Sequence, residues 1–510
     1  MKPEDIIILI AAYFGVLLVI SWFTSRKSTE QTFYNGDHKS PWYIVAFGLI
    51  GTSLSAVSLV SVTGNVQSTN IESNHFSYMQ IVAGYVVGYI IISYVLLPLY
   101  YKHNLTSIYN YLSIRFGNRS RKTGAFYFIL SRMLGASARV YLAVVVMEGL
   151  VISQLGFYVP FEATVAIILF LIFLYTFQSG IKTIIWTDTL QTILLLAAIG
   201  FAIVELNSLL GNSIDENLKL IVNNNFTEVF TTGTSGFIKN FLAGLFICVT
   251  MTGLDQGMMQ RSLSCPSLKD AQKNIMSFAV VVFIVNLLFV YIGALLAQHV
   301  LSTGLHFDRT DAIFPYIAST SFAPVAMGLF VLGMIAATFS SADDAMAALT
   351  TSLSLDIFGI KGETKRDGVL RKIIHLGVAA GMFLLIVLFF KGSADAVIGM
   401  VLKIGSITYG PLLGMFAFGM ISKKKLQDSY MPWIAIISPL LVAGICIYIY
   451  YLRNIDFKLE NLFSLAQIWK MVFSVVGTEI IVYIAATCYF MMWFFSDGKQ
   501  SEKVVVVEGL

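Results

Sequence analysis

Apolar segments of about 20 residues recur along the whole chain of 510 residues. A helix of that length crosses the roughly 30 Å hydrocarbon core of a bilayer. The segments lack the alternation of polar and apolar residues found in membrane β-barrels. We therefore predict an all-α polytopic membrane protein with about thirteen transmembrane helices. The predicted spans are 5–24, 42–65, 76–101, 122–153, 159–178, 183–206, 236–260, 273–298, 321–357, 370–390, 395–421, 430–452 and 470–495.

The composition excludes several classes of protein. Only 12% of the residues are charged, against about 25% in a soluble domain. The sequence shows no Walker motif, no nucleophile–base set and no soluble segment of catalytic size, so we expect neither an enzyme nor an ATP-driven pump. The four cysteines form no CxxC motif, and a net charge of +4 predicts no nucleic-acid partner. The lipid bilayer and small ligands are the expected partners, and no obligate protein partner is inferred.

Lysine and arginine residues are unevenly distributed between the predicted loops. Loops on one side of the membrane carry twenty-two of them, and loops on the other side carry eight. The positive-inside rule places the richer side in the cytoplasm. We expect a multi-pass protein of the cell (inner, plasma) membrane with its N-terminus outside and its C-terminus inside. Segment 1–23 lacks a small-residue cleavage site, so we interpret it as a retained helix rather than a signal peptide.

Two adjacent acids stand inside one of the apolar segments, in the stretch SSADDAMAALTTS at 340–352. Residues three and four apart share a helix face, so Ala337, Ser340, Ser341 and Asp344 form one stripe, and Asp343 adjoins Ser340. Hydroxyl and carboxylate oxygens on one stripe suit a hard cation such as Na⁺. In the alternative, the serines bond to carbonyls of the preceding turn and the acids pair with an arginine from another helix.

Two other segments carry polar groups at membrane depth, where such groups are usually functional. Asp188 lies about 9 Å beyond Lys182 along its helix, among threonines, and an interfacial acid is the alternative interpretation. Segment 47–65 alternates glycine with serine and threonine, which favours a broken helix beside a cavity. Close packing of small residues between helices is the alternative there.

Charged residues also mark two further helices. Asp255 lies near the end of a span, and we interpret Gln260, Arg261 and the residues after them as a solvated helix end. Arg132 and Arg139 are seven residues apart and share a helix face. They could neutralise the adjacent acids at 343 and 344 or meet an anionic solute, and for Arg132 we favour the first role.

Five segments resemble, in order, stretches of the sodium/solute symporter family, which includes sodium/glucose and sodium/sialic acid cotransporters. The segments are LTSIYNYLSIRFG (105–117), GIKTIIWTDTLQ (180–191), GLDQGMMQRSLSC with LKDAQ (253–272), AATFSSADDAMAALTTSLSLDIF (336–358) and ITYGPLLGMF (407–416). The resemblance implies a LeuT-type five-helix inverted repeat in a single transmembrane domain, 1–510. Its parts would be an extra N-terminal helix and loop (1–41), a first repeat (42–206), a second inverted repeat (236–421), and two C-terminal helices with a tail (422–510). The first helix of each repeat, 42–65 and 236–260, would be broken.

The resemblance also implies which residues bind the coupling ion, Na⁺. Carried over by position, the ligands of the primary Na⁺ site would be the carbonyls of Gly51, Leu54 and Ala337 and the hydroxyls of Ser340 and Ser341.

Relatives that move two Na⁺ ions have a second cation site. It would be formed here by Asp188, Ser340, Asp343 and Asp344. Hydroxyls stand in those relatives where this chain has its two adjacent acids. The acids could bind a cation, hold a proton, or pair with one of the two arginines of segment 132–139.

The resemblance implies a Na⁺-coupled symporter that imports a small polar solute by alternating access. A sugar or a sugar acid such as sialic acid is the first expectation. An amino acid, a monocarboxylate or a polyol, proton coupling, and a membrane solute sensor are the alternatives. The candidate solute-binding residues are Ser53, Ser55, Ser58, Gln80, Arg139 and Asp255.

Overall fold

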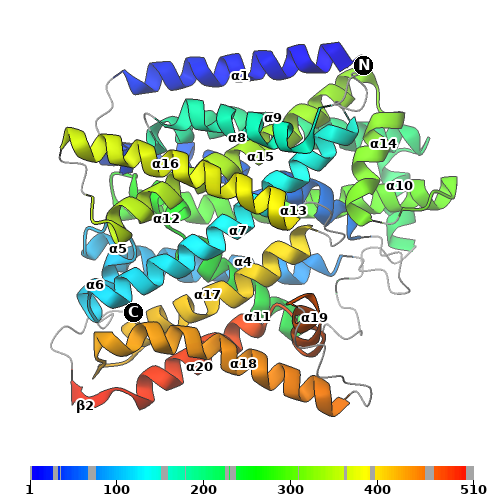
Figure 1. The fold of residues 1–510 in the computed structure, drawn as a ribbon. Helices are drawn as coiled ribbons and strands as arrows, with labels where there is room; N and C mark the ends of the chain where they lie inside the picture. The colour runs from blue at the N-terminus through cyan, green and yellow to red at the C-terminus, as the bar shows by residue number, and fades with distance from the viewer. Residues whose placement is uncertain are drawn as a thin grey trace.

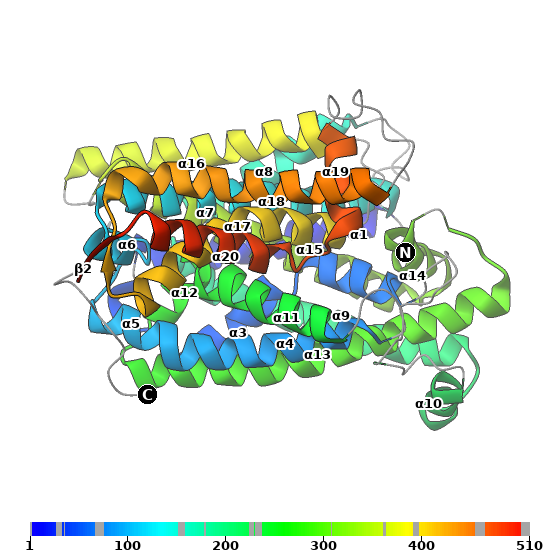
Figure 2. The same cartoon turned by 90° about the horizontal axis from the view of Figure 1, so that it is seen from below.

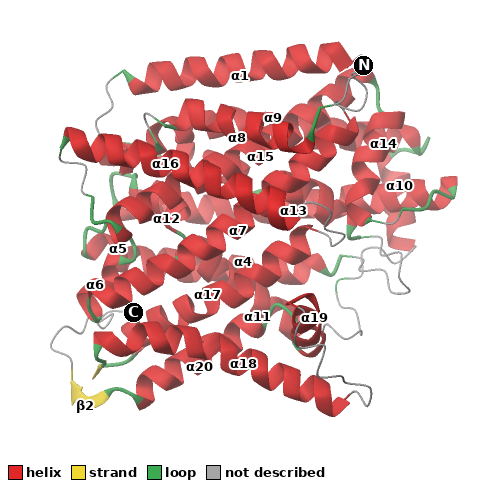
Figure 3. Ribbon diagram, in the orientation of Figure 1, coloured by secondary structure: helices red, strands yellow, loops and turns green. Residues whose placement is uncertain are grey.

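The computed structural model describes residues 3–26, 33–34, 36–66, 76–150, 159–177, 180–223, 229, 237–307, 309–360, 364–390, 397–453 and 465–500. These residues are mostly helical (Figure 3), and a short antiparallel pair joins β1 (Lys424–Lys425) to β2 (Asp497–Gln500). The helices are α1 (Pro3–Ser25), α3 (Trp42–Ser53), α4 (Tyr78–Ile91), α5 (Leu97–Lys102), α6 (Asn110–Arg115), α7 (Asn118–Leu150), α8 (Phe161–Thr176), α9 (Ile181–Leu209), α10 (Ile214–Asn223), α11 (Phe237–Cys248), α12 (Gln256–Leu263), α13 (Leu268–Thr303), α14 (Ile313–Ser321), α15 (Pro324–Ser352), α16 (Lys365–Leu385), α17 (Val397–Ile421), α18 (Met431–Arg453), α19 (Leu465–Val475) and α20 (Ile480–Phe494).

Nine helices in the described part of the chain are long and apolar enough to cross a membrane. A tenth span forms if the bent pair Phe237–Gly253 and Gln256–Leu263 is counted as one. The shorter apolar helices α3, α8 and α20 fall within the three remaining predicted spans. The prediction of an all-α polytopic membrane protein is therefore confirmed.

One predicted span is wrong in detail. The single helix expected over 470–495 is divided into α19 and α20, and Gly477 lies in the break between them. Average hydropathy does not register one glycine that interrupts an otherwise apolar run, although glycine disfavours a helix interior. The ends predicted for 122–153 and 159–178 and the starts predicted for 236–260 and 395–421 lie outside the described residues.

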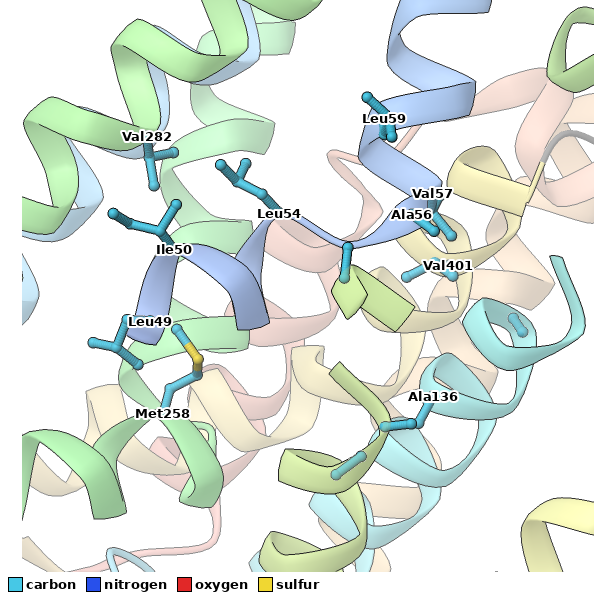
Figure 4. Packing of buried hydrophobic residues seen from close by; sticks show 14 of the residues in the cluster. Leu49, Ile50, Leu54, Ala56, Val57, Leu59, Ala136, Met258, Val282 and Val401 are labelled. Carbon is cyan, nitrogen blue, oxygen red and sulfur yellow. The ribbon is translucent and has the colours of Figure 1, made fainter. Parts of the chain in front are cut away.

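The first broken helix lies within the predicted span 42–65. Helix α3 ends at Ser53, Leu54 and Ser55 leave the helical path, and the chain becomes helical again at Ala56 before the π-helical turn η2 (Ser58–Val62). Figure 4 shows the two helical pieces joined by this unwound stretch, with Leu54 and Ala56 at its ends. The break frees backbone groups at membrane depth, which is tolerated only where protein, an ion or a cavity meets them. The prediction of a broken helix here is confirmed.

The second broken helix lies at the end of the predicted span 236–260. Helix α11 continues into the π-helical turn η5 (Val249–Gly253), and the axis then turns by 62° into α12. Asp255 caps α12, because its side chain accepts a hydrogen bond from the backbone N–H of Met258 at 3.1 Å. The two breaks therefore differ chemically, since only the second carries a charged residue at the turn.

Helix α15 carries the stretch with two adjacent acids and is the most enclosed of the long apolar helices described. In its most apolar window 89% of the residues are buried, against 28% in α1. It packs against α9, α7 and α3. Figure 1 shows α1 along one edge of the bundle and α18 and α20 along the opposite edge, with α15 between them. Figures 1 and 2 both place the start of α1 and strand β2 at opposite ends of the bundle.

Candidate cation and solute site

Ser340 lies on α15 where that helix meets α3 and α9. Its hydroxyl donates to Asp188 Oδ1 at 2.5 Å and lies 3.1 Å from the hydroxyl of Thr52. The backbone N–H of Gly51 donates to Thr192 Oγ1 at 3.0 Å, and a Cβ added to Gly51 would lie 3.2 Å from Ser340 Oγ. The structure therefore brings together three predicted ligands, from three different helices.

The other three predicted primary ligands flank this junction. Leu54 lies in the unwound stretch after α3, and Ala337 and Ser341 are fully buried on α15. The Ser341 hydroxyl donates to the Thr338 carbonyl at 2.9 Å, and its oxygen can still accept a hydrogen bond or bind a cation. The described residues contain no group of three or more His, Cys, Asp or Glu able to hold a metal. A cation here would depend on carbonyl and hydroxyl oxygens, which suit Na⁺.

The two adjacent acids of α15 face different neighbours, because successive residues of a helix point about 100° apart. Asp343 Oδ2 accepts a hydrogen bond from the Tyr175 hydroxyl of α8 at 2.9 Å. Asp344 accepts from Arg132 of α7 and forms an ion pair with Arg261 of α12 at 2.9 Å. Among the roles left open for Asp344, the structure shows pairing with Arg132. Among the described residues, Asp343 has no ion-pair partner.

Arg261 corrects the sequence interpretation of a solvated helix end. Its side chain is 1% exposed, and Gln260 before it is also buried. Its Nη1 lies 2.5 Å from Asp188 Oδ2, and the same nitrogen donates to the Thr52 hydroxyl. The 62° turn before α12 directs this residue into the bundle instead of toward water.

Acids and arginines alternate through the buried centre. Arg261 joins Asp188 to Asp344, and Arg132 joins Asp344 to Asp255 with an Nη1–Oδ2 distance of 3.5 Å. All five side chains are buried. Buried charges persist only when they are paired and hydrogen-bonded, so the alternation explains how three acids remain in an apolar bundle.

A cavity of about 110 Å³ opens beside the first helix break. Four of the six candidate solute-binding residues line it: Ser53, Ser55, Ser58 and Arg139. The wall also includes three tyrosines and the Asn286 amide. A small solute here would meet hydroxyls from the broken helix and a guanidinium from α7.

The other two candidate residues do not line this cavity. Gln80 is fully buried, donates to the Val229 carbonyl, and accepts from Asn240 of α11 at 2.6 Å. Asp255 caps α12 and accepts from the Tyr409 hydroxyl at 3.1 Å. Both side chains are engaged within the protein.

The model of one protein family, the sodium:solute symporter family, matches residues 33–429. The chain belongs to this family. It is therefore a Na⁺-coupled solute symporter of the membrane and not an enzyme. A curated relative is the sodium/sialic acid symporter SiaT of Proteus mirabilis (strain HI4320), 22% identical over 453 residues that cover 81% of this chain and 84% of the relative. Another is the sodium-coupled monocarboxylate transporter 2 of Homo sapiens, 24% identical over 446 residues that cover 82% of this chain and 68% of the relative.

Solved structures show the same fold. A Na⁺-coupled sialic acid symporter in a substrate-bound, outward-open state matches this symporter with a TM-score of 0.75 and 19% identity, over 97% of this chain and 99% of that chain. Mhp1, a nucleobase-cation-symport-1 family transporter, matches with a TM-score of 0.52 and 15% identity, over 90% and 94% of the two chains. The LeuT-type fold expected from the sequence is confirmed.

Sequence reasoning missed two residues that organise the centre of the symporter. Thr52 touches Ser340, Asp188 and Arg261 at once, and Arg261 is the cation shared by two acids. A count of membrane-depth charges could have indicated the need for Arg261. Four acids were predicted at membrane depth (Asp188, Asp255, Asp343 and Asp344) but only two arginines, so at least two further positive charges were needed.

Proposed function

We propose that this symporter imports a small carboxylate solute, with a sugar acid as the first candidate and a monocarboxylate as the second. The observation that carries the proposal is the state of Arg139. It lines the cavity, and it forms no hydrogen bond or ion pair with any residue that the structure describes. Arg132, on the same helix face, is already shared by two acids. The cavity therefore offers one guanidinium to an incoming anion.

The chemistry of the cavity supports this solute class. A guanidinium binds a carboxylate through two parallel hydrogen bonds, which supply both strength and orientation. The serine hydroxyls at 53, 55 and 58 and the Asn286 amide can bind the hydroxyls of a sugar acid. Sialic acid and monocarboxylates, named for the two relatives above, both carry the carboxylate that this arrangement selects.

The ion and the solute would be coupled through the first helix break. In our proposal, Gly51, Leu54 and Ala337 offer carbonyls and Ser340 and Ser341 offer hydroxyls to one Na⁺ ion. The same unwound stretch continues into the cavity wall, so ordering it by Na⁺ binding pre-forms the solute site. Rocking of the repeats 42–206 and 236–421 against each other would then open the site inward. The excess of Lys and Arg in one set of loops supports a cytoplasmic C-terminus.

Uptake into proteoliposomes tests the proposal. Radiolabelled sialic acid, lactate and glucose would be offered with an inward Na⁺ gradient or with K⁺ in its place. We expect Na⁺-dependent uptake of a carboxylate and its loss, by about tenfold or more, in Arg139→Gln, because a charge-assisted bidentate contact contributes about 1.5–3 kcal/mol.

Arg119→Gln is the matched control for this test. It makes the same substitution near the start of the same helix, where the residue is exposed and away from the cavity, and we expect normal uptake. Na⁺-dependent uptake of glucose alone, unchanged in Arg139→Gln, would contradict the carboxylate assignment.

A further inference from the structure

The centre of the bundle contains an arginine where an ion could lie. Arg261 places Nη1 2.5 Å from Asp188 Oδ2 and Nη2 2.9 Å from Asp344 Oδ1. Both carboxylates are fully buried and belong to different helices, α9 and α15. Of the other two predicted ligands, Ser340 donates a hydrogen bond to Asp188, and Asp343 accepts one from the Tyr175 hydroxyl. The two carboxylates that could hold a second cation between them, Asp188 and Asp344, therefore already face a guanidinium.

The fold brings α12 close enough for this contact. Gly257 opens the first turn of α12, and a Cβ there would lie 2.8 Å from both carboxylate oxygens of Asp344 and 3.0 Å from the Cβ of Ala348. A side chain at this position would displace either the Asp344 carboxylate from its ion pairs or α12 from α15. The glycine thus permits the approach of the two helices at which Arg261 reaches both acids.

Electrostatics makes a guanidinium and a second Na⁺ mutually exclusive in this place. Both carry one positive charge, and like charges a few ångströms apart repel strongly where water is absent. Arg261 is bound by two acids and a hydroxyl. A Na⁺ ion that displaced it would leave the guanidinium charge buried and unpaired, which is costly.

We propose that Arg261 is a tethered cation that occupies the second cation position, so that this symporter binds one Na⁺ per transport cycle. The inference rests on the primary Na⁺ site of the proposed function. It extends that function by assigning the stoichiometry to a residue of the chain itself.

Equilibrium binding of ²²Na⁺ to the purified full-length protein tests the proposal without a solute. The number of ions bound per protein and the Hill coefficient would be measured in choline chloride buffer. We expect one ion and no cooperativity in the wild type. In Arg261→Gln we expect two ions and a Hill coefficient above one, because Asp188 and Asp344, without the guanidinium between them, can bind a second Na⁺ ion. Arg261→Lys keeps the positive charge, so we expect it to bind one ion, as the wild type does. If the residue had a purely structural role, the number of bound ions would not depend on its charge.

A second variant keeps the test decisive if Arg261→Gln does not fold. Arg261→Gln combined with Asp344→Ser removes one charge of each sign and leaves Asp188 with serine hydroxyls on either side. We expect two ions in this double variant. Two ions in the wild type would overturn the inference and point to Asp343 as the further ligand. One ion in every folded variant would overturn it as well. Zero ions in the wild type would instead contradict the primary site of the proposed function.

Discussion

Each of the two broken helices of this symporter frees polar backbone groups at membrane depth, but the side chains around the two breaks are different. At the first break, between α3 and η2, no charged residue is present, and the wall of a cavity is formed by serine hydroxyls and unwound backbone. At the second, between η5 and α12, an aspartate caps the new helix and Arg261 follows within two turns, paired with acids of two other helices. The serine side chains of the first break line a cavity, whereas the aspartate and the arginine of the second break pair with residues of the protein.

This difference shows how one bundle can contain both a site that rearranges, at the first break, and a site that stays fixed, at the second. Carbonyls and hydroxyls beside an unwound stretch become ordered when an ion binds them, so under the proposed function the first break is expected to respond to Na⁺. Separating a buried ion pair is costly, because it leaves both charges without a partner and without solvent. The second break is therefore expected to position the first, and each of the following variants tests one side of this contrast.

Asp344→Asn should have the largest effect, since it takes a partner from Arg261 and from Arg132 together. Removing one member of a buried pair costs about 3–5 kcal/mol. We expect a large drop in thermal unfolding temperature of the detergent-solubilised protein. Asp215→Asn is the control, because Asp215 pairs with Lys219 on α10, where the two side chains are 75% and 69% exposed. An exposed ion pair contributes about 1 kcal/mol or less. Equal shifts in the two variants would contradict a special role for the buried network.

Gly51→Ala should have an intermediate effect, at the first break. The new Cβ would lie 2.7 Å from Thr192 Oγ1, which now accepts the Gly51 N–H and donates to the Phe47 carbonyl. Overpacking of this kind costs about 1–3 kcal/mol, and we expect reduced thermal stability and weaker stabilisation by Na⁺. Gly200→Ala on α9 is the control, since nothing lies within 4 Å of its added Cβ. If both variants behaved alike, α3 and α9 would not be in close contact at the site.

Ser341→Ala should have the smallest effect and the most selective one. Removing one hydroxyl ligand is expected to lower Na⁺ affinity about tenfold, or roughly 1.4 kcal/mol, with little change of stability in the absence of Na⁺. The Na⁺ concentration that gives half-maximal thermal stabilisation measures it. Ser406→Ala is the matched control, because Ser406 is equally buried on α17 and donates its hydroxyl to a carbonyl of the preceding turn. An unchanged Na⁺ dependence in Ser341→Ala would remove this residue from the primary site.

Much of the fold was predictable from local pattern. The long apolar segments correspond to helices of the structure, and the glycine- and serine-rich run of 47–65 contains the first break. The stripe of Ser340, Ser341 and Asp344 also followed from helical spacing alone, and all three residues are buried. These features depend only on residues close together in the sequence, which is why they could be predicted.

The partners of the charged residues were less predictable. Arg261 was misinterpreted because it follows an apolar segment and precedes a stretch rich in polar residues, a pattern typical of a helix end in water. Gln80 was expected at a solute site, yet it hydrogen-bonds to Asn240 of a helix about 160 residues away in the sequence. Contacts of this kind depend on the relative placement of helices, which no local pattern encodes.

The sequence by itself therefore determined that this chain is a bundle of membrane-spanning helices with polar groups at set depths. The reason is that a backbone in lipid must satisfy its own hydrogen bonds, and only long apolar helices do so here. Tertiary structure alone decided which acid meets which arginine. The 62° turn before α12 and the missing side chain at Gly257 bring Arg261 between two acids, because a charge buried in a bundle must find its counter-ion on another helix.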